Sequence, residues 1–153
     1  MQEYALLLGA TLSAGTVIAL AALGLLINEK AGVVNLGAEG MMLCAALAGF
    51  ATTVATGNEW LGFAAGMGAG ALLAGVFGWL VIWLHTNQYA TGLALSLFGV
   101  GFSAFAGLGY VQAKLPELAP DGVPLLSDLP LVGPALFAHD PLVYGAIALA
   151  LAL

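Results

Sequence analysis

The chain has 153 residues, of which 62% are hydrophobic and 7% charged, and its formal net charge is −6. Soluble domains carry about a quarter charged residues, so this composition excludes an ordinary water-soluble domain. The charges also leave long gaps, because none lies between Glu3 and Glu29, between Glu39 and Glu59, or between Glu59 and Lys114. A membrane-spanning helix needs about 20 mostly apolar residues. The sequence therefore predicts an all-α integral membrane protein.

The gaps between charges predict where the helices lie. The first gap predicts a helix at about residues 4–28, and the second a short helix at about 36–56. The third gap is long enough for two helices, at about 60–85 and 89–112. We divide them at the polar cluster HTNQYATG, residues 85–92, which is the only such cluster in that gap.

The character of the sequence changes after the fourth predicted helix. All six prolines lie within residues 113–141, and proline at that density ends helices, so an extramembrane loop is expected there. A new apolar run begins at 142 and reaches 153, which is too short to span a membrane. The expected fold is a polytopic helical bundle with four complete transmembrane helices and the start of a fifth. Residues 1–153 are expected to be the amino-terminal part of one transmembrane domain.

The lysines give little information about orientation. Lys30 and Lys114 are separated by three predicted helices, so they fall on opposite sides and cancel in the count of positive charges. The short turn expected at Glu29 and Lys30 suits the cytoplasm, and the long acidic loop suits the outside. We therefore favour an external amino terminus.

The third predicted helix carries small residues every four positions. The stripe consists of Gly62, Gly66, Gly70, Ala74 and Gly78. On the fourth helix, Gly99, Ser103 and Gly107 repeat the spacing. Small residues at this spacing let helix backbones approach closely in membranes, so helix packing is favoured over a ligand-facing groove.

The sequence offers no candidate for catalysis, cofactor binding or metal binding. It has two basic residues, both lysines, and lacks a phosphate-binding loop of the G-x-x-x-x-G-K-[ST] type. His85 and His139 have no second histidine or cysteine at ligand spacing, and Cys44 is the only cysteine. We expect a non-enzymatic protein that does not bind nucleic acid.

The most informative segment is NEKAGVVNLGAEG, residues 28–40, which places polar residues and glycines between two membrane-length runs. One interpretation is structural: Asn35 caps the second helix, and Glu39 favours the positive end of that helix. The other is functional: the glycines let the backbone break, and Asn35 and Glu39 face a polar pathway. A second polar cluster, formed by Asn87, Gln88, Thr91 and Ser96, either faces the same cavity or caps the fourth helix.

These two segments resemble a known family. NEKAGVVNLGAEGMMLCAALAGF, residues 28–50, is similar to the E-[RK]-A-G-V-x-N-[LI]-G-x-E-G-M-M stretch of bacterial ABC-transporter permeases of the nucleoside and simple-sugar branch. These permeases are related to the ribose and branched-chain amino-acid permeases. TNQYATGLALSL, residues 86–97, resembles the family's second stretch, N-[QE]-V-[VI]-[ST]-G-x-A-[LI]-N-L. The chain differs there at Tyr89 and Ser96, where the family commonly has valine and asparagine.

The resemblance implies a function. Family members are multi-pass subunits of the bacterial cell membrane, about twice as long as this chain, which would make it a fragment of one permease domain. They pair with a second permease subunit, a cytoplasmic ABC ATPase and an external substrate-binding lipoprotein. The loop that couples to the ATPase would lie outside this chain, and the acidic loop would face outward. The resemblance therefore implies uptake of nucleosides or related simple sugars by alternating access, with ATP hydrolysed by the partner.

Two alternatives come from other functional classes. An ion-coupled secondary transporter would use Glu39 as a titrating group. A non-transporting membrane assembly subunit would need only the small-residue stripes.

Overall fold

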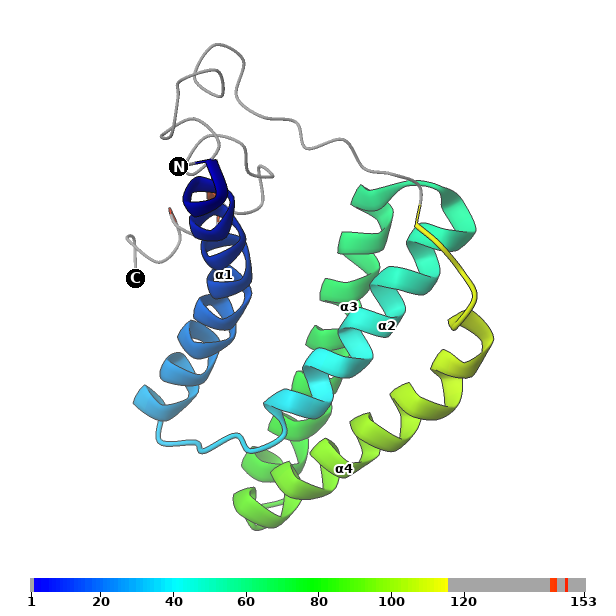
Figure 1. Cartoon of the computed structure of the whole chain (residues 1–153). Helices are drawn as coiled ribbons and strands as arrows, with labels where there is room; N and C mark the ends of the chain where they lie inside the picture. The colour runs from blue at the N-terminus through cyan, green and yellow to red at the C-terminus, as the bar shows by residue number, and fades with distance from the viewer. Residues whose placement is uncertain (1, 116–143, 146–147, 149–153) are drawn as a thin grey trace. The chain divides into compact units, whose positions relative to one another are not determined.

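A computed structural model describes residues 2–115, 144–145 and 148 of the chain. The elements found there are all helical (Figure 1). The chain divides into two compact units: α1 lies mostly in one, and the described part of Asn28–Glu117 forms the other, with α2, α3 and α4. The predicted loop 113–141 lies outside the described residues except at 113–115. The predicted fifth helix, 142–153, lies outside them except at 144–145 and 148.

Helix α1, Gln2–Lys30, ends in a glycine turn. The Gly32 amide donates to the Glu29 carbonyl and the Val33 amide to the Asn28 carbonyl, while Gly32 has a φ of +81°. This is a Schellman motif, in which a left-handed glycine closes the helix and satisfies its last carbonyls. Glu29 and Lys30 therefore belong to the helix, and the turn predicted at these two residues is wrong: it lies at Ala31 and Gly32.

Helices α2, Ala38–Thr56, and α3, Glu59–Gly78, form a tight hairpin. Gly57 closes α2 in the left-handed conformation, with its amide donating to the Thr53 carbonyl. Asn58 then caps α3 by accepting from the amides of Trp60 and Leu61. The sequence Gly-Asn thus ends one helix and starts the next, which explains how the two helices reverse direction within two residues.

The third predicted helix does not stay α-helical to His85. After Gly78 the chain forms a π-helical turn, Trp79–Trp83, in which the Leu84 amide donates to the Trp79 carbonyl. Thr86 ends it, because both its amide and its hydroxyl donate to the Leu80 carbonyl. His85 lies outside the helix with a φ of 53°. Helix α4, Gln88–Gly107, follows and tightens into a 3₁₀ turn, Leu108–Tyr110, so Gln112 also lies beyond the helix.

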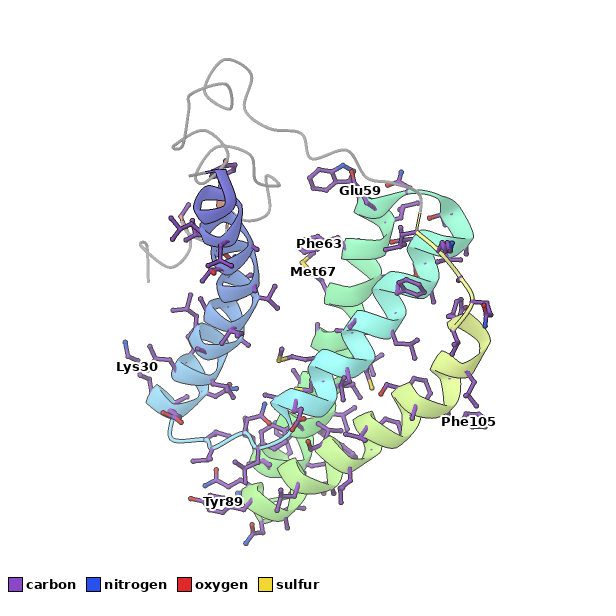
Figure 2. All side chains as sticks on the ribbon, viewed as in Figure 1. Lys30, Glu59, Phe63, Met67, Tyr89 and Phe105 are labelled. Atoms are coloured by element: carbon purple, nitrogen blue, oxygen red, sulfur yellow. The ribbon has the colours of Figure 1, made fainter. Side chains whose placement is uncertain are left out.

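Within the described residues, four helices are long and apolar enough to cross a membrane. With 19 residues, α2 is about 28 Å long, close to the hydrocarbon thickness of a bilayer. Large apolar side chains such as Phe63, Met67 and Phe105 are exposed and project away from the ribbon (Figure 2). Such exposure suits lipid or further helices rather than water. The predicted fold class, a polytopic helical membrane protein, is confirmed.

Helix α2 holds the second unit together. Both α3 and α4 pack extensively on α2, whereas α3 and α4 have few contacts with each other (Figure 1). Gly62 and Gly66 face the α2 backbone, where a Cβ atom on Gly66 would lie 3.0 Å from the Ala45 carbonyl oxygen. A Cβ atom on Gly70 would lie 3.7 Å from the Ala45 Cβ atom, an ordinary contact. Further along the stripe, Ala74 is exposed and Gly78 is half-buried.

Candidate functional site

The two polar segments singled out in the sequence meet in space. The stretch that leads into α2 lies against the first turns of α4, although the two are more than 50 residues apart in sequence. The Gln88 side-chain oxygen accepts a hydrogen bond of 3.0 Å from the Val34 amide. We define the candidate site as residues 33–40 together with 86–99, at the end of the unit where α2 and α4 begin.

Glycines allow this close approach. A Cβ atom on Gly92 would lie 2.8 Å from the Leu36 amide nitrogen, and one on Gly40 would lie 2.7 Å from the Ser96 Cα atom. A Cβ atom on Gly99 would collide with the Gly40 backbone. Backbone therefore packs directly on backbone along this crossing, which is the arrangement that small residues permit in membranes.

Asn35 is buried and bonded within its own segment. Its side-chain oxygen accepts from the Gly37 amide at 2.9 Å, and its side-chain nitrogen lies 3.7 Å from the Met41 sulfur. The N-cap of α2 is Gly37 rather than Asn35, so α2 begins two residues later than predicted. The reason is that the Asn35 side chain closes a local turn over Leu36 and Gly37, which delays the helix.

Two of the other candidates support helix α4. Asn87 caps it, because its side-chain oxygen accepts from the amides of Tyr89 and Ala90. The Thr91 hydroxyl lies 2.9 Å from the Thr86 hydroxyl, which links the first turn of α4 to the end of the π-helical turn. For these residues the geometry fits the capping interpretation of the second polar cluster.

Glu39 and Ser96 differ from the rest. Among the described residues, neither side chain makes a hydrogen bond or ion pair. Ser96 is half-buried beside Gly40, whereas Glu39 is exposed in the first turn of α2. Glu39 is thus an exposed carboxyl side chain at the start of α2 that has no partner among the described residues.

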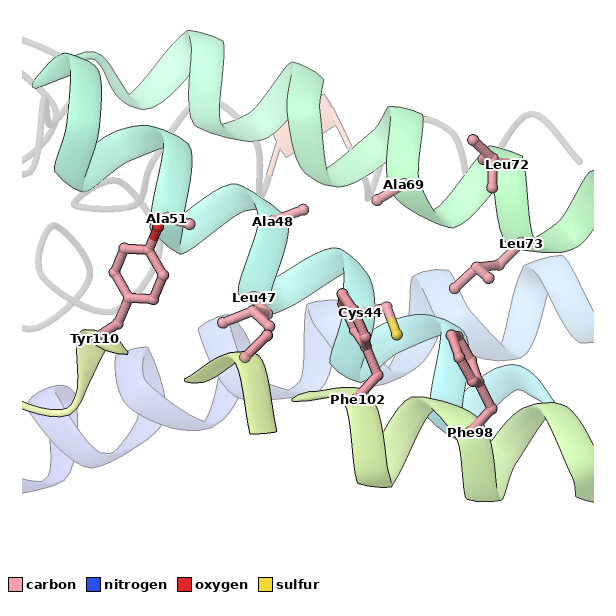
Figure 3. Close-up of a pocket in the computed structure, with 11 residues that line it drawn as sticks. Cys44, Leu47, Ala48, Ala51, Ala69, Leu72, Leu73, Phe98, Phe102 and Tyr110 are labelled. Carbon is pink, nitrogen blue, oxygen red and sulfur yellow. The ribbon is translucent and has the colours of Figure 1, made fainter. Parts of the chain in front are cut away.

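A large cavity in this unit borders the candidate site at Phe98, where α3 and α4 diverge over α2. It has a volume of about 490 Å³, and Figure 3 shows Cys44, Phe98 and Phe102 among the side chains that line it. The lining is almost wholly apolar, with further contributions from leucines and alanines of α2 and α3. A sugar or nucleoside needs polar partners that converge on it, and this groove lacks them. The groove suits acyl chains or apolar side chains.

Sequence reasoning missed the contact residues of the site. The sequence pattern assigns none of Gly37, Gly40 and Gly92 to the packing of α2 against α4. The closest contacts from α4 are made at Gly92, Ser96 and Gly99, and Gly107 of the predicted stripe lies near Leu47. The available signal was that both polar segments contain glycine: Gly32, Gly37 and Gly40 in the first and Gly92 in the second. Residues far apart in the sequence cannot be paired from spacing alone.

Comparisons with known proteins agree with this picture. The family described as branched-chain amino acid transport system / permease component matches residues 7–153. A Haloferax volcanii protein named "Putative glucose ABC transporter permease protein" is 47% identical over 92% of this chain and 44% of its own length. The guanosine ABC transporter permease protein of Bacillus subtilis is 32% identical over 100% of this chain and 50% of its own length.

A more distant relative is the nucleoside ABC transporter permease protein of Lactococcus lactis subsp. cremoris, 25% identical over 78% of this chain and 41% of its own length. The chain thus spans about half the length of the curated relatives that it matches. No solved structure matches the chain significantly.

Proposed function

The chain belongs to the family of permease components of branched-chain amino acid transport systems, and from this premise we propose that it supplies transmembrane helices to the permease subunit of an ATP-driven importer. The observation that carries the proposal is the direct contact between the two family-like segments, residues 28–50 and 86–97. Segments that resemble a transporter family and pack together fit a role in one working part of the membrane domain.

The proposed substrates are nucleosides or related simple sugars. The relatives are named for glucose, guanosine and nucleosides, which share hydroxyl-rich rings and a neutral overall charge. Only 7% of the residues are charged, so the chain offers few groups that would bind a charged solute, which suits a neutral one. The apolar groove beside Phe98 is not part of the proposed pathway, because it offers no polar partners.

The proposed mechanism is alternating access. The partner ATPase drives rearrangement of the helices, and this subunit forms the route of the solute across the membrane and the segments that open and close it. Glu39 is the strongest pathway candidate, because an ionised group within a transmembrane helix is expensive unless it faces water or a polar partner. The other polar candidates lie in the same region and would stabilise the backbone that lines the pathway: Asn35, Asn87, Gln88, Thr91 and Ser96.

The proposed assembly contains a second permease subunit, a cytoplasmic ABC ATPase and an external substrate-binding lipoprotein. We place the protein in the cell membrane, bacterial or archaeal, since relatives occur in both kinds of organism. We place the end of the unit that carries Lys30 and Gln88 in the cytoplasm, as the short turn there favours.

Uptake by the reconstituted transporter tests the proposal. The full-length protein, with its second permease subunit, ATPase and binding protein in proteoliposomes, should accumulate radiolabelled guanosine or glucose only when ATP is enclosed with the ATPase. A protonophore should leave uptake unchanged. Uptake that persists without ATP and collapses with the protonophore would show an ion-coupled transporter instead, and the absence of flux for both solutes would contradict this substrate class.

The role of Glu39 is tested separately. Glu39→Gln should remove most of the uptake while the protein still inserts and assembles, because the variant keeps size and hydrogen bonding but loses the charge. Glu29→Gln is the matched control, since Glu29 is also an exposed carboxylate at a helix end and should tolerate the change. Equal uptake by both variants would leave Glu39 with a structural role only.

A further inference from the structure

The segment between α1 and α2 has an irregular backbone, and only some of its amides are paired. Residues Val33–Asn35 have no regular structure and are followed by a turn at Leu36 and Gly37. Near a bilayer, water is scarce, so a protein acceptor for such an amide stabilises the backbone where it is found. The Val33 amide is satisfied by the end of α1, and the Gly37 amide by the Asn35 side chain. The Val34 amide is the one that depends on another helix, through Gln88.

Gln88 is well placed for this contact. It is the first residue of α4, directly after the cap residue Asn87, and it is half-buried. Four residues later, on the same face, Gly92 leaves room for the Leu36 and Gly37 amides to lie on the α4 backbone. Gln88 thus accepts the hydrogen bond from the Val34 amide, and Gly92 leaves the space that Leu36 and Gly37 occupy.

We propose that Gln88 is a positioning residue: its side-chain oxygen holds the segment that leads into α2 on the first turn of α4. This contact fixes the position of the start of α2 relative to α4. It thereby fixes the position of Glu39, which lies in the first turn of α2. The requirement is for an acceptor oxygen at this reach and not for an amide group or a charge. The consequence for transport rests on the proposed function, whereas the contact itself does not.

The contact is tested by amide-resolved hydrogen exchange on the full-length protein in detergent or nanodiscs. Among the described residues, the Asn35 and Leu36 amides have no hydrogen-bond partner, so they serve as internal references. In the unmodified protein, the Val34 amide should exchange about tenfold more slowly than these neighbours. Exchange of Val34 at the rate of Asn35 and Leu36 would overturn the proposal without any variant.

Substitutions then identify the acceptor. Gln88→Met keeps length but removes the oxygen, so Val34 exchange should accelerate by about tenfold. Gln88→Glu keeps an acceptor oxygen in either protonation state and should retain the protection. Gln112→Met, at an exposed position beyond α4, is the matched control and should change nothing. Unchanged protection in Gln88→Met, or equal loss in Gln88→Glu and Gln88→Met, would overturn the proposal.

The same variants address transport. Gln88→Met should lower the maximal uptake rate of guanosine or glucose, and Gln88→Glu should restore it, while Gln112→Met behaves as the unmodified protein. If the unmodified transporter takes up neither solute, the proposed function fails while the exchange result still decides the contact. Normal uptake by a Gln88→Met variant that has lost Val34 protection would overturn the transport consequence alone.

Discussion

Gly99 and Gly40 bring the backbones of α4 and α2 into direct contact, and this contact can be tested with a single methyl group. A Cβ atom on Gly99 would collide with the Gly40 backbone, which cannot move aside as a flexible side chain can. Gly99→Ala should therefore destabilise the folded protein by about 1–3 kcal/mol, the usual cost of overpacking. The measurement is thermal or denaturant unfolding of the purified full-length protein.

Gly101 is the matched control for this substitution. It lies on the same helix, two residues away, and a Cβ atom there meets nothing within 4 Å among the described residues. Gly101→Ala should be neutral or slightly stabilising, because alanine favours the helix. If Gly99→Ala and Gly101→Ala have the same unfolding midpoint, the backbones of α2 and α4 do not approach each other closely at Gly40 and Gly99.

Gly32 and Gly24 predict opposite effects of the same substitution. Gly32 has a φ of +81° at the end of α1, a conformation that alanine adopts only with strain, so Gly32→Ala should cost about 1 kcal/mol. Gly24 lies inside α1, where a Cβ atom meets nothing within 4 Å among the described residues, and Gly24→Ala should stabilise by about 0.5–1 kcal/mol. Unfolding curves of the two variants should shift in opposite directions from the unmodified protein.

At the scale of the elements, helix ends are set by short polar signals. Asn58 caps α3 with hydrogen bonds to the Trp60 and Leu61 amides, of 2.9 and 3.3 Å. Asn58→Ala should cost about 1 kcal/mol of stability, whereas Asn58→Asp keeps the acceptor and should cost little. Chemical denaturation of both variants measures the difference. Equal losses would mean that the side-chain oxygen is not what starts α3.

Within residues 2–115, the four long helices and their order could be predicted from the sequence, but the ends of these helices and the two short helical turns could not. Gaps between charges located the helices, because charge is excluded from spanning segments. The sequence does not predict the end of α3, because Trp79–Trp83 is as apolar as the helix before it. The π-helical turn is visible only in the hydrogen bonds, from the Leu84 amide to the Trp79 carbonyl and from Thr86 to the Leu80 carbonyl. The start of α2 was misplaced because Asn35 can either cap a helix or close a turn, and its sequence neighbours do not distinguish these.

The candidate site could be predicted only as two separate halves. Polar residues in an apolar chain marked both segments, but the bond between Val34 and Gln88 joins residues 54 apart in sequence. Nothing in a single sequence pairs such residues. The glycine contacts were likewise hidden, because Gly40 and Gly99 look like many other glycines in this chain until the helices are placed against each other.

At the scale of the whole molecule, the antiparallel order of α2, α3 and α4 predicts which residues share a side of the membrane. Glu29 and His85 should lie on one side, and Asn58 on the other. In the full-length protein with its native cysteines replaced, Cys44 included, single cysteines at Glu29 and His85 should be labelled by an impermeant maleimide from the same side. A cysteine at Asn58 should be labelled only from the opposite side, and labelling of Asn58 together with His85 would contradict this order.

The central place of α2 has a consequence for how the protein is made. α2 and α3 are joined by Gly57 and Asn58, so they can pair as soon as both have left the translocation machinery. α4 is synthesised later and packs on a different face of α2, with little help from α3. During that interval, the glycine surface at Gly37 and Gly40 is open to lipid and to other newly inserted helices. We therefore expect correct assembly to require that α4 packs on this surface before another helix does, and misassembly to increase when synthesis of α4 is slowed.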